Sequence, residues 1–178
     1  SFREAFDMSL GAAGFAGTFM LQISTMLGIA FGGWLSDRAA QRGTQRRMLV
    51  QGLSYLAAAP FLLLFLLRPG FAVVTLAVSI FSFFRGVGQA NENPTLCEVI
   101  PVRYRSTAIG LMNTCATAAG GIGVLLAGVL KSTFGLNAIF AGISLLFVIA
   151  GAALVYAYRH WITRDIERAN STEYTPAD

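Results

Sequence analysis

The chain has 178 residues, of which 55% are hydrophobic and only 12% are charged. About a quarter of the residues in soluble domains are charged, so this composition excludes an ordinary soluble domain and predicts a membrane protein. The formal net charge is +4, but the arginines lie between apolar runs rather than on one polar face, so we expect no nucleic-acid partner.

Residues 1–10 are polar and are expected to form an extracytoplasmic connection. The first apolar run, residues 11–34, is long enough to cross a hydrocarbon layer of about 30 Å at ~1.5 Å per residue. Gly28 and Gly32 in this run have the GxxxG spacing that lets two helices approach closely. We therefore expect this helix to pack tightly against a neighbour.

A compact loop of residues 35–47, which holds four arginines, leads to the second apolar run, residues 48–67. The third run, residues 71–100, continues from apolar into polar residues without a loop signal. Pro94 lies near its end and permits a bend, because proline removes one backbone hydrogen bond of a helix.

The fourth run covers residues 107–130, and its row of small residues (Ala119, Gly123 and Ala127) predicts a second packing face. A short turn leads to the fifth run, residues 138–158. The second and fifth runs are nearly featureless and are expected to face lipid. The fold class predicted for residues 11–158 is therefore all-α, a polytopic membrane bundle of five transmembrane helices.

Basic residues indicate the orientation of this bundle. The loops and tail that follow runs one, three and five hold nine of them, whereas the opposite side holds three. Positive charge accumulates in cytoplasmic loops, so the tail, residues 159–178, is expected to be cytoplasmic. Because the tail loses hydrophobic content, we expect it to be disordered beyond about Asn170. We expect an integral protein of a bacterial cytoplasmic (inner) membrane.

Arg85 is the least expected residue of the third run. It lies roughly 21 Å from the outer end of a continuous helix, where a charge costs on the order of 3 kcal/mol and normally faces a partner or a water-filled cavity. Gln89 and Glu92 follow at the spacing i+4 and i+7, so they share its face. Arg85 either binds a substrate carboxylate or phosphate together with Gln89, or pairs with Glu92 as an internal strut or gate.

Three further polar residues and a second role for Glu92 complete the candidate site. Glu92 is a candidate for a protonatable coupling group, with Asn91 beside it in coupling or gating. Asn113 and Gln22 lie at membrane depth and either bind the same ligand or make hydrogen bonds between helices. The two cysteines and the single histidine form no metal motif, and no catalytic nucleophile with a base is visible, so we expect neither a metal or cofactor nor an enzyme.

The segment GGWLSDRAAQRGTQRR, residues 32–47, resembles the loop signature of the major facilitator superfamily of secondary transporters. The matching residues are a glycine four residues before Asp-Arg and a following basic cluster: Gly33, Asp37, Arg38, Arg46 and Arg47. The loop is slightly longer than the tightest form of the signature, which leaves open whether Arg42, Arg46 or Arg47 takes each basic role. The resemblance implies a conformational role at the cytoplasmic end, and the alternative is a solvated loop that only sets topology.

Residues 85–113 are similar to the tenth and eleventh helices of sugar and organic-anion permeases in that superfamily. The chain then corresponds to helices 8–12 of twelve, or alternatively to helices 2–6. The resemblance implies alternating-access transport of a small polar solute (a sugar, a sugar acid or another organic anion), with a proton or sodium as coupling ion and the amino-terminal half of the same protein as partner. A non-transporting receptor or assembly subunit is the alternative function.

Overall fold

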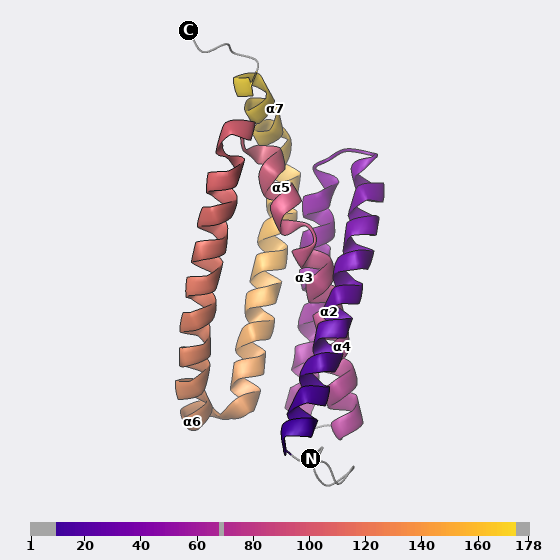
Figure 1. Ribbon diagram of the computed structural model, residues 1–178, viewed down its shortest axis with the longest axis vertical. Helices are drawn as coiled ribbons and strands as arrows, with labels where there is room; N and C mark the ends of the chain where they lie inside the picture. The colour runs from indigo at the N-terminus through magenta and orange to yellow at the C-terminus, as the bar shows by residue number, and fades with distance from the viewer. Residues whose placement is uncertain (1–9, 68–69, 174–178) are drawn as a thin grey trace.

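All five apolar runs fold as helices that stand side by side in one bundle (Figure 1). The computed structural model describes residues 10–67 and 70–173, and no strand occurs among them. The expected connection of residues 1–10, apart from Leu10, and the last residues of the tail lie outside this described part. The predicted all-α class is confirmed.

The helices follow one another along the chain with short connections. They are α2 (Leu10–Ala40), α3 (Arg46–Leu63) with the 3₁₀ turn η1 (Leu64–Leu67), α4 (Phe71–Gln89), α5 (Glu92–Val99), the 3₁₀ turn η2 (Val102–Tyr104), α6 (Arg105–His160) and α7 (Ile162–Glu173). α2 thus extends six residues beyond the predicted end of its run. Asp37 and Arg38 lie in its last turns and not in the loop where we expected them.

Four stretches of the described residues are long and apolar enough to cross a membrane: Thr18–Ala40, Val73–Val99, Val102–Lys131 and Asn137–His160. α3 is not among them. It begins with two arginines and includes the buried polar residues Gln51 and Ser54, which lower its mean hydropathy. It nevertheless runs through the bundle beside the other helices (Figure 1).

α6 is a hairpin of two long arms, which Figure 1 shows running in opposite directions. The arms meet at Gly135, whose φ of 78° and ψ of 171° suit a residue without a side chain. This break lies within the turn expected between the fourth and fifth runs. We call residues 105–134 the first arm and residues 136–160 the second arm.

The third apolar run is two helices rather than one continuous span. α4 ends at Gln89 and α5 begins at Glu92, so the chain breaks at Ala90 and Asn91. Pro94 falls in the first turn of α5, where its missing N–H is least costly because first-turn N–H groups have no partner within the helix. The bend that Pro94 permits therefore occurs just before it.

Glycines let α2 and α4 approach closely. A Cβ added at Gly28 would overlap the backbone oxygen of Phe83, and one added at Gly32 would lie 2.6 Å from the Cα of Val87. From the other side, a Cβ at Gly86 would overlap the backbone oxygen of Thr25. The expected close packing of the Gly28 and Gly32 face is confirmed.

The second predicted packing face, on the first arm of α6, has no such neighbour within the described chain. Ala119 and Gly123 are exposed, and a Cβ added at Gly123 would have no atom within 4 Å. Spacing alone did not distinguish this row from the one on α2.

α3 is packed on two sides, against α4 and against the second arm of α6, which differs from the lipid-facing helix that we expected. Ala59 and Leu62 are almost fully buried. Gly52 and Gly151 face each other backbone to backbone, and the hydroxyl of Ser144 donates a 2.8 Å hydrogen bond to the Ala59 carbonyl oxygen. Small residues on α3 make this close contact possible.

The tail is helical as far as the structure describes it, three residues beyond the point where we expected disorder to begin, and residues 174–178 lie outside the described part. α7 occupies Ile162–Glu173 and packs against α5 and α6. Its contact side buries Ile162 and Ala169, while its other side is polar. The helical structure of α7 therefore depends on apolar residues that recur about one turn apart on one side, and not on the overall hydrophobicity of the segment.

Candidate functional site

The polar face of the third run begins on α4 and continues across the break into α5. Arg85 and Gln89 are exposed on α4, and Glu92 is half-buried at the start of α5. The opposite side of the same segment is buried, because Val87 and Asn91 face α2 and the bundle interior. The exposed side is therefore the one available to a ligand.

Glu92 is held by a residue that the sequence did not single out. The hydroxyl of Tyr55, from α3, donates a 2.8 Å hydrogen bond to Oε1 of Glu92. The side chain of Gln51, one turn earlier on α3, lies within hydrogen-bonding reach of the same hydroxyl. These three side chains form a polar contact between α3 and α5.

The ring of Tyr55 is fixed from two sides. Gly88 lies against it so closely that a Cβ at this position would overlap the ring. Phe147, from the second arm of α6, packs edge-on with its ring centroid 5.3 Å away. Phe81 in turn packs on Phe147 at 5.0 Å, one helical turn before Arg85.

Arg85 lies one turn before Gly88, which packs against the Tyr55 ring. Within residues 10–67 and 70–173, however, its guanidinium makes no ion pair and no hydrogen bond, with Glu92 or any other group. The strut between Arg85 and Glu92, one of the two predicted alternatives, is not formed here. Glu92 has Tyr55 as its partner instead.

The remaining candidates do not join this group. Asn113 on the first arm of α6 and Gln22 on α2 are both exposed, and no hydrogen bond connects either of them to Arg85 in the described part of the chain. Asn91 is fully buried, and its Nδ2 donates a 2.9 Å hydrogen bond to the Val87 carbonyl oxygen. The Asn91 side chain thus binds a carbonyl oxygen near the end of α4 and does not face the exposed side.

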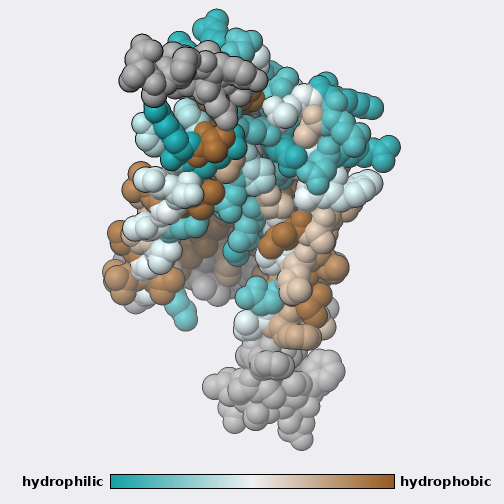
Figure 2. Space-filling model, turned by 45° about the horizontal axis from the view of Figure 1, so that its top comes forward, coloured by the Kyte–Doolittle hydropathy of each residue, from teal (hydrophilic) through white to brown (hydrophobic). Residues whose placement is uncertain are grey.

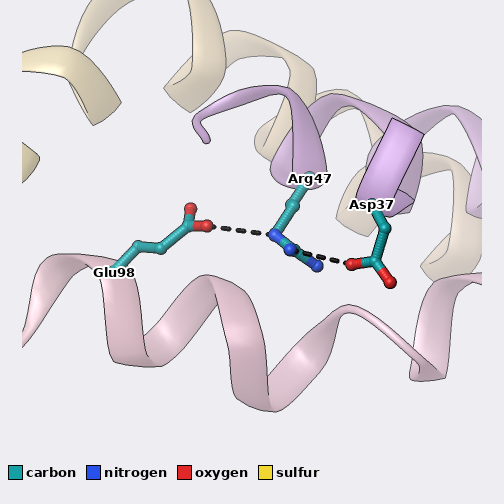
Figure 3. Close-up of polar contacts among 3 residues, drawn as sticks. All are labelled: Asp37, Arg47 and Glu98. Carbon is teal, nitrogen blue, oxygen red and sulfur yellow. Dashed lines mark ion pairs between the residues drawn. The ribbon is translucent and has the colours of Figure 1, made fainter. Parts of the chain in front are cut away.

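A second polar group lies at the other end of α5, where Arg47 bridges two carboxylates (Figure 3). Its Nη2 lies 2.9 Å from Oδ1 of Asp37, and its Nε lies 3.2 Å from Oε1 of Glu98. The Arg47 and Glu98 side chains are 22% and 17% exposed, whereas Asp37 is 70% exposed. We call this contact between α2, α3 and α5 the Arg47 bridge.

The other residues of the loop signature have different surroundings. The guanidinium of Arg38 lies over the Trp34 ring at 5.8 Å from its centroid. Arg46 begins α3 and is half-buried. A Cβ added at Gly33 would meet no atom within 4 Å, so this glycine makes no close approach within the described residues.

Sequence reasoning missed three members of these groups, Gln51, Tyr55 and Glu98. Glu98 carried a usable signal, because a carboxylate near the end of an apolar run normally requires a cationic partner. Tyr55 carried a weaker one: a hydroxyl in a run that otherwise looked featureless. Neither partner could be named from spacing within one helix.

The basic residues of α2, α3, η2 and α7, together with Arg105 and Arg159 of α6, gather at one end of the bundle, since each lies where a helix reaches that end (Figure 1). Lys131 of α6 lies by the turn at Gly135, at the other end. Figure 2 shows hydrophilic side chains covering this end and continuing as a strip between two hydrophobic flanks. Among the described residues, no three His, Cys, Asp or Glu side chains gather closely enough to hold a metal ion.

The Arg47 bridge allows a prediction about stability. Arg47→Gln leaves the mostly buried Glu98 carboxylate without a partner, so we expect a loss of about 2 kcal/mol, between the values for exposed and buried pairs. Asp37→Asn is the matched control, because it removes only an exposed pair and should cost less than about 1 kcal/mol. Thermal unfolding of the purified full-length protein measures both. Equal melting temperatures for the two variants would contradict the assigned role of Glu98.

A match to a known protein family covers almost the whole chain. A family model described as Major Facilitator Superfamily matches residues 1–175, which include both polar groups. No curated protein and no solved structure matches the chain.

Proposed function

Since the chain belongs to the Major Facilitator Superfamily, we propose that it forms the substrate-binding and gating part of a secondary transporter for a small organic anion. The family consists of membrane transporters rather than enzymes. We further propose that the chain corresponds to helices eight to twelve, and that it works together with an amino-terminal half of the same protein.

One observation supports the anionic substrate: Arg85 is exposed and makes no ion pair within the described residues, while the nearby carboxylate of Glu92 is bound by Tyr55. An uncompensated arginine at membrane depth is costly and is usually retained for a ligand. Its planar fork of N–H donors matches a carboxylate or phosphate with two parallel hydrogen bonds. Gln89, exposed one turn further on, supplies an amide for a second contact.

Alternating access requires the two ends of the bundle to open in turn. The Arg47 bridge ties the ends of α2, α3 and α5 together at the end rich in basic residues, which we propose to be cytoplasmic. Its two ion pairs would stabilise one state of the transport cycle and separate in the other. We propose Glu92 as the group that couples transport to a proton or to sodium, since it is the carboxylate next to Arg85 on the exposed face.

The proposal is tested by uptake into proteoliposomes that contain the purified full-length protein. The probes are labelled organic acids, each paired with a neutral analogue of the same size, such as glucuronate with glucose. We expect uptake of at least one acid at rates on the order of tenfold or more above its neutral analogue, because Arg85 contributes a charge-assisted contact only to the acid. Uptake of the neutral analogues at equal or higher rates, or no uptake across the panel, would overturn the proposal.

A further inference from the structure

We propose that Tyr55 is a positioning residue that holds Glu92 away from Arg85 and so keeps the guanidinium open to the substrate. This inference rests on the proposed role of Arg85 in binding an anion. It adds a residue from α3, a helix to which the sequence assigned no function.

Without the Tyr55 hydroxyl, we expect Arg85 and Glu92 to form an ion pair. Glu92 accepts a 2.8 Å hydrogen bond from the Tyr55 hydroxyl, and Arg85 lies one turn before Gly88, which packs against the Tyr55 ring, so both charged residues lie near Tyr55. Opposite charges attract more strongly away from bulk water, and an arginine and a carboxylate can pair through two parallel hydrogen bonds. Such a pair would occupy the donors that a substrate carboxylate needs.

Tyr55 is well suited to prevent this pairing. A hydrogen bond from a hydroxyl to a carboxylate is roughly twice as strong as one between neutral groups. The Tyr55 ring is already fixed between Gly88 and Phe147, so little side-chain entropy is lost in keeping the hydroxyl on Glu92. Gln51 provides a further partner for the same hydroxyl.

Gly88 supports the same interpretation from the other helix. A Cβ at this position would overlap the Tyr55 ring and would also lie 2.8 Å from the Ser54 hydroxyl. The absence of a side chain at residue 88 is therefore what lets the ring reach across α4 to Glu92. The same turn of α4 thus carries Arg85 and, at Gly88, leaves the space for Tyr55, which holds Glu92.

The reactivity of Arg85 tests the proposal without knowledge of the substrate. Phenylglyoxal modifies free guanidinium groups, and mass spectrometry of the purified full-length protein measures the modification rate at each arginine. In Tyr55→Phe, released Glu92 should pair with Arg85 and slow its modification about fivefold. Tyr55→Phe with Glu92→Gln should restore the wild-type rate, because the amide carries no charge to pair with Arg85.

Two controls make the result specific. Arg42, exposed in the loop between α2 and α3, is an internal reference whose rate should be the same in every variant. Tyr156→Phe removes the same hydroxyl from a tyrosine that is 53% exposed on α6 and should leave Arg85 unchanged. An unchanged Arg85 rate in Tyr55→Phe, or a lowered rate that Glu92→Gln does not restore, would overturn the proposal.

Protection by a substrate separates this inference from the proposed function. If Tyr55 positions Glu92 and Arg85 binds the anion, a transported acid should protect Arg85 from phenylglyoxal in the wild type and protect it less in Tyr55→Phe. A rate that responds to Tyr55→Phe but to no acid of the panel would support the positioning role and overturn the anion site. Protection that is equal in both proteins would support the anion site and overturn the positioning role.

Discussion

Gly28→Leu is expected to remove most of the folded protein from the membrane. A Cβ at Gly28 already overlaps the backbone oxygen of Phe83, and backbone atoms cannot move aside as the end of a flexible side chain can. A leucine would force α2 and α4 apart along the face where Gly32 and Gly86 also bring the two backbones together. Overpacking a tight contact costs about 1–3 kcal/mol and more where backbone is involved, so we expect the folded yield to fall on the order of tenfold or more.

Gly142→Leu is the matched control for this variant. Gly142 lies in the second arm of α6, is exposed, and has no atom within 4 Å of an added Cβ in the described part of the chain. Fluorescence-detected size-exclusion chromatography of tagged full-length protein measures the monodisperse fraction of each variant. Similar yields and melting temperatures for Gly28→Leu and the wild type would show that α2 and α4 do not meet at this face.

Arg85→Lys is expected to leave the protein folded and to lower uptake of its anionic substrate strongly. Lysine keeps the positive charge but loses the planar fork that binds a carboxylate through two hydrogen bonds. Hydrogen bonds to charged groups contribute about 1.5–3 kcal/mol, so we expect a decrease in uptake of about 10- to 100-fold. Arg164→Lys, an equivalent change at an exposed position of α7, should leave uptake unchanged. Uptake by Arg85→Lys at the wild-type rate would show that charge alone is sufficient at this position.

Hydropathy was enough to locate the long apolar helices, because a spanning helix needs a long apolar run and few other structures tolerate one. The α2 face was also predictable, since Gly28 and Gly32 lie on one side of one helix. The same spacing logic failed for Ala119 and Gly123, which have no neighbour within the described chain. Small residues make close packing possible, but they do not say where the partner helix is.

The two polar groups were beyond the reach of the sequence because each depends on the packing of several helices. Tyr55 and Glu92 are 37 residues apart and meet only because α3 lies beside α4 and α5. Arg47 likewise reaches Glu98 from a different helix. Periodicity grouped Arg85 with Glu92 on one face of a continuous helix, but it could not show that the helix breaks between them or that a residue of α3 would bind Glu92.

Helix ends were the other source of error, and the reason is local. Leu35 to Ala40 contain charged residues but no helix breaker, so α2 continues to Ala40. Gly43, with a φ of 139°, then allows the chain to turn. The polar stretch after His160 forms α7 because its few apolar residues recur on one side and can pack against α5. Composition averaged over a segment hides both effects.

Transport by the double variant Arg85→Ala with Glu92→Ala tests the central claim most directly. If Arg85 binds the substrate, the purified full-length protein should remain folded, because both charges are gone, yet it should neither take up nor exchange the anion in proteoliposomes. Glu92→Ala alone, which removes only the proposed coupling group, should still exchange labelled for unlabelled anion. If Arg85 serves only to neutralise Glu92, removing both groups should restore uptake that Arg85→Ala alone had lost. We expect a folded protein without transport, and recovery of transport at the wild-type rate would contradict the role assigned to Arg85.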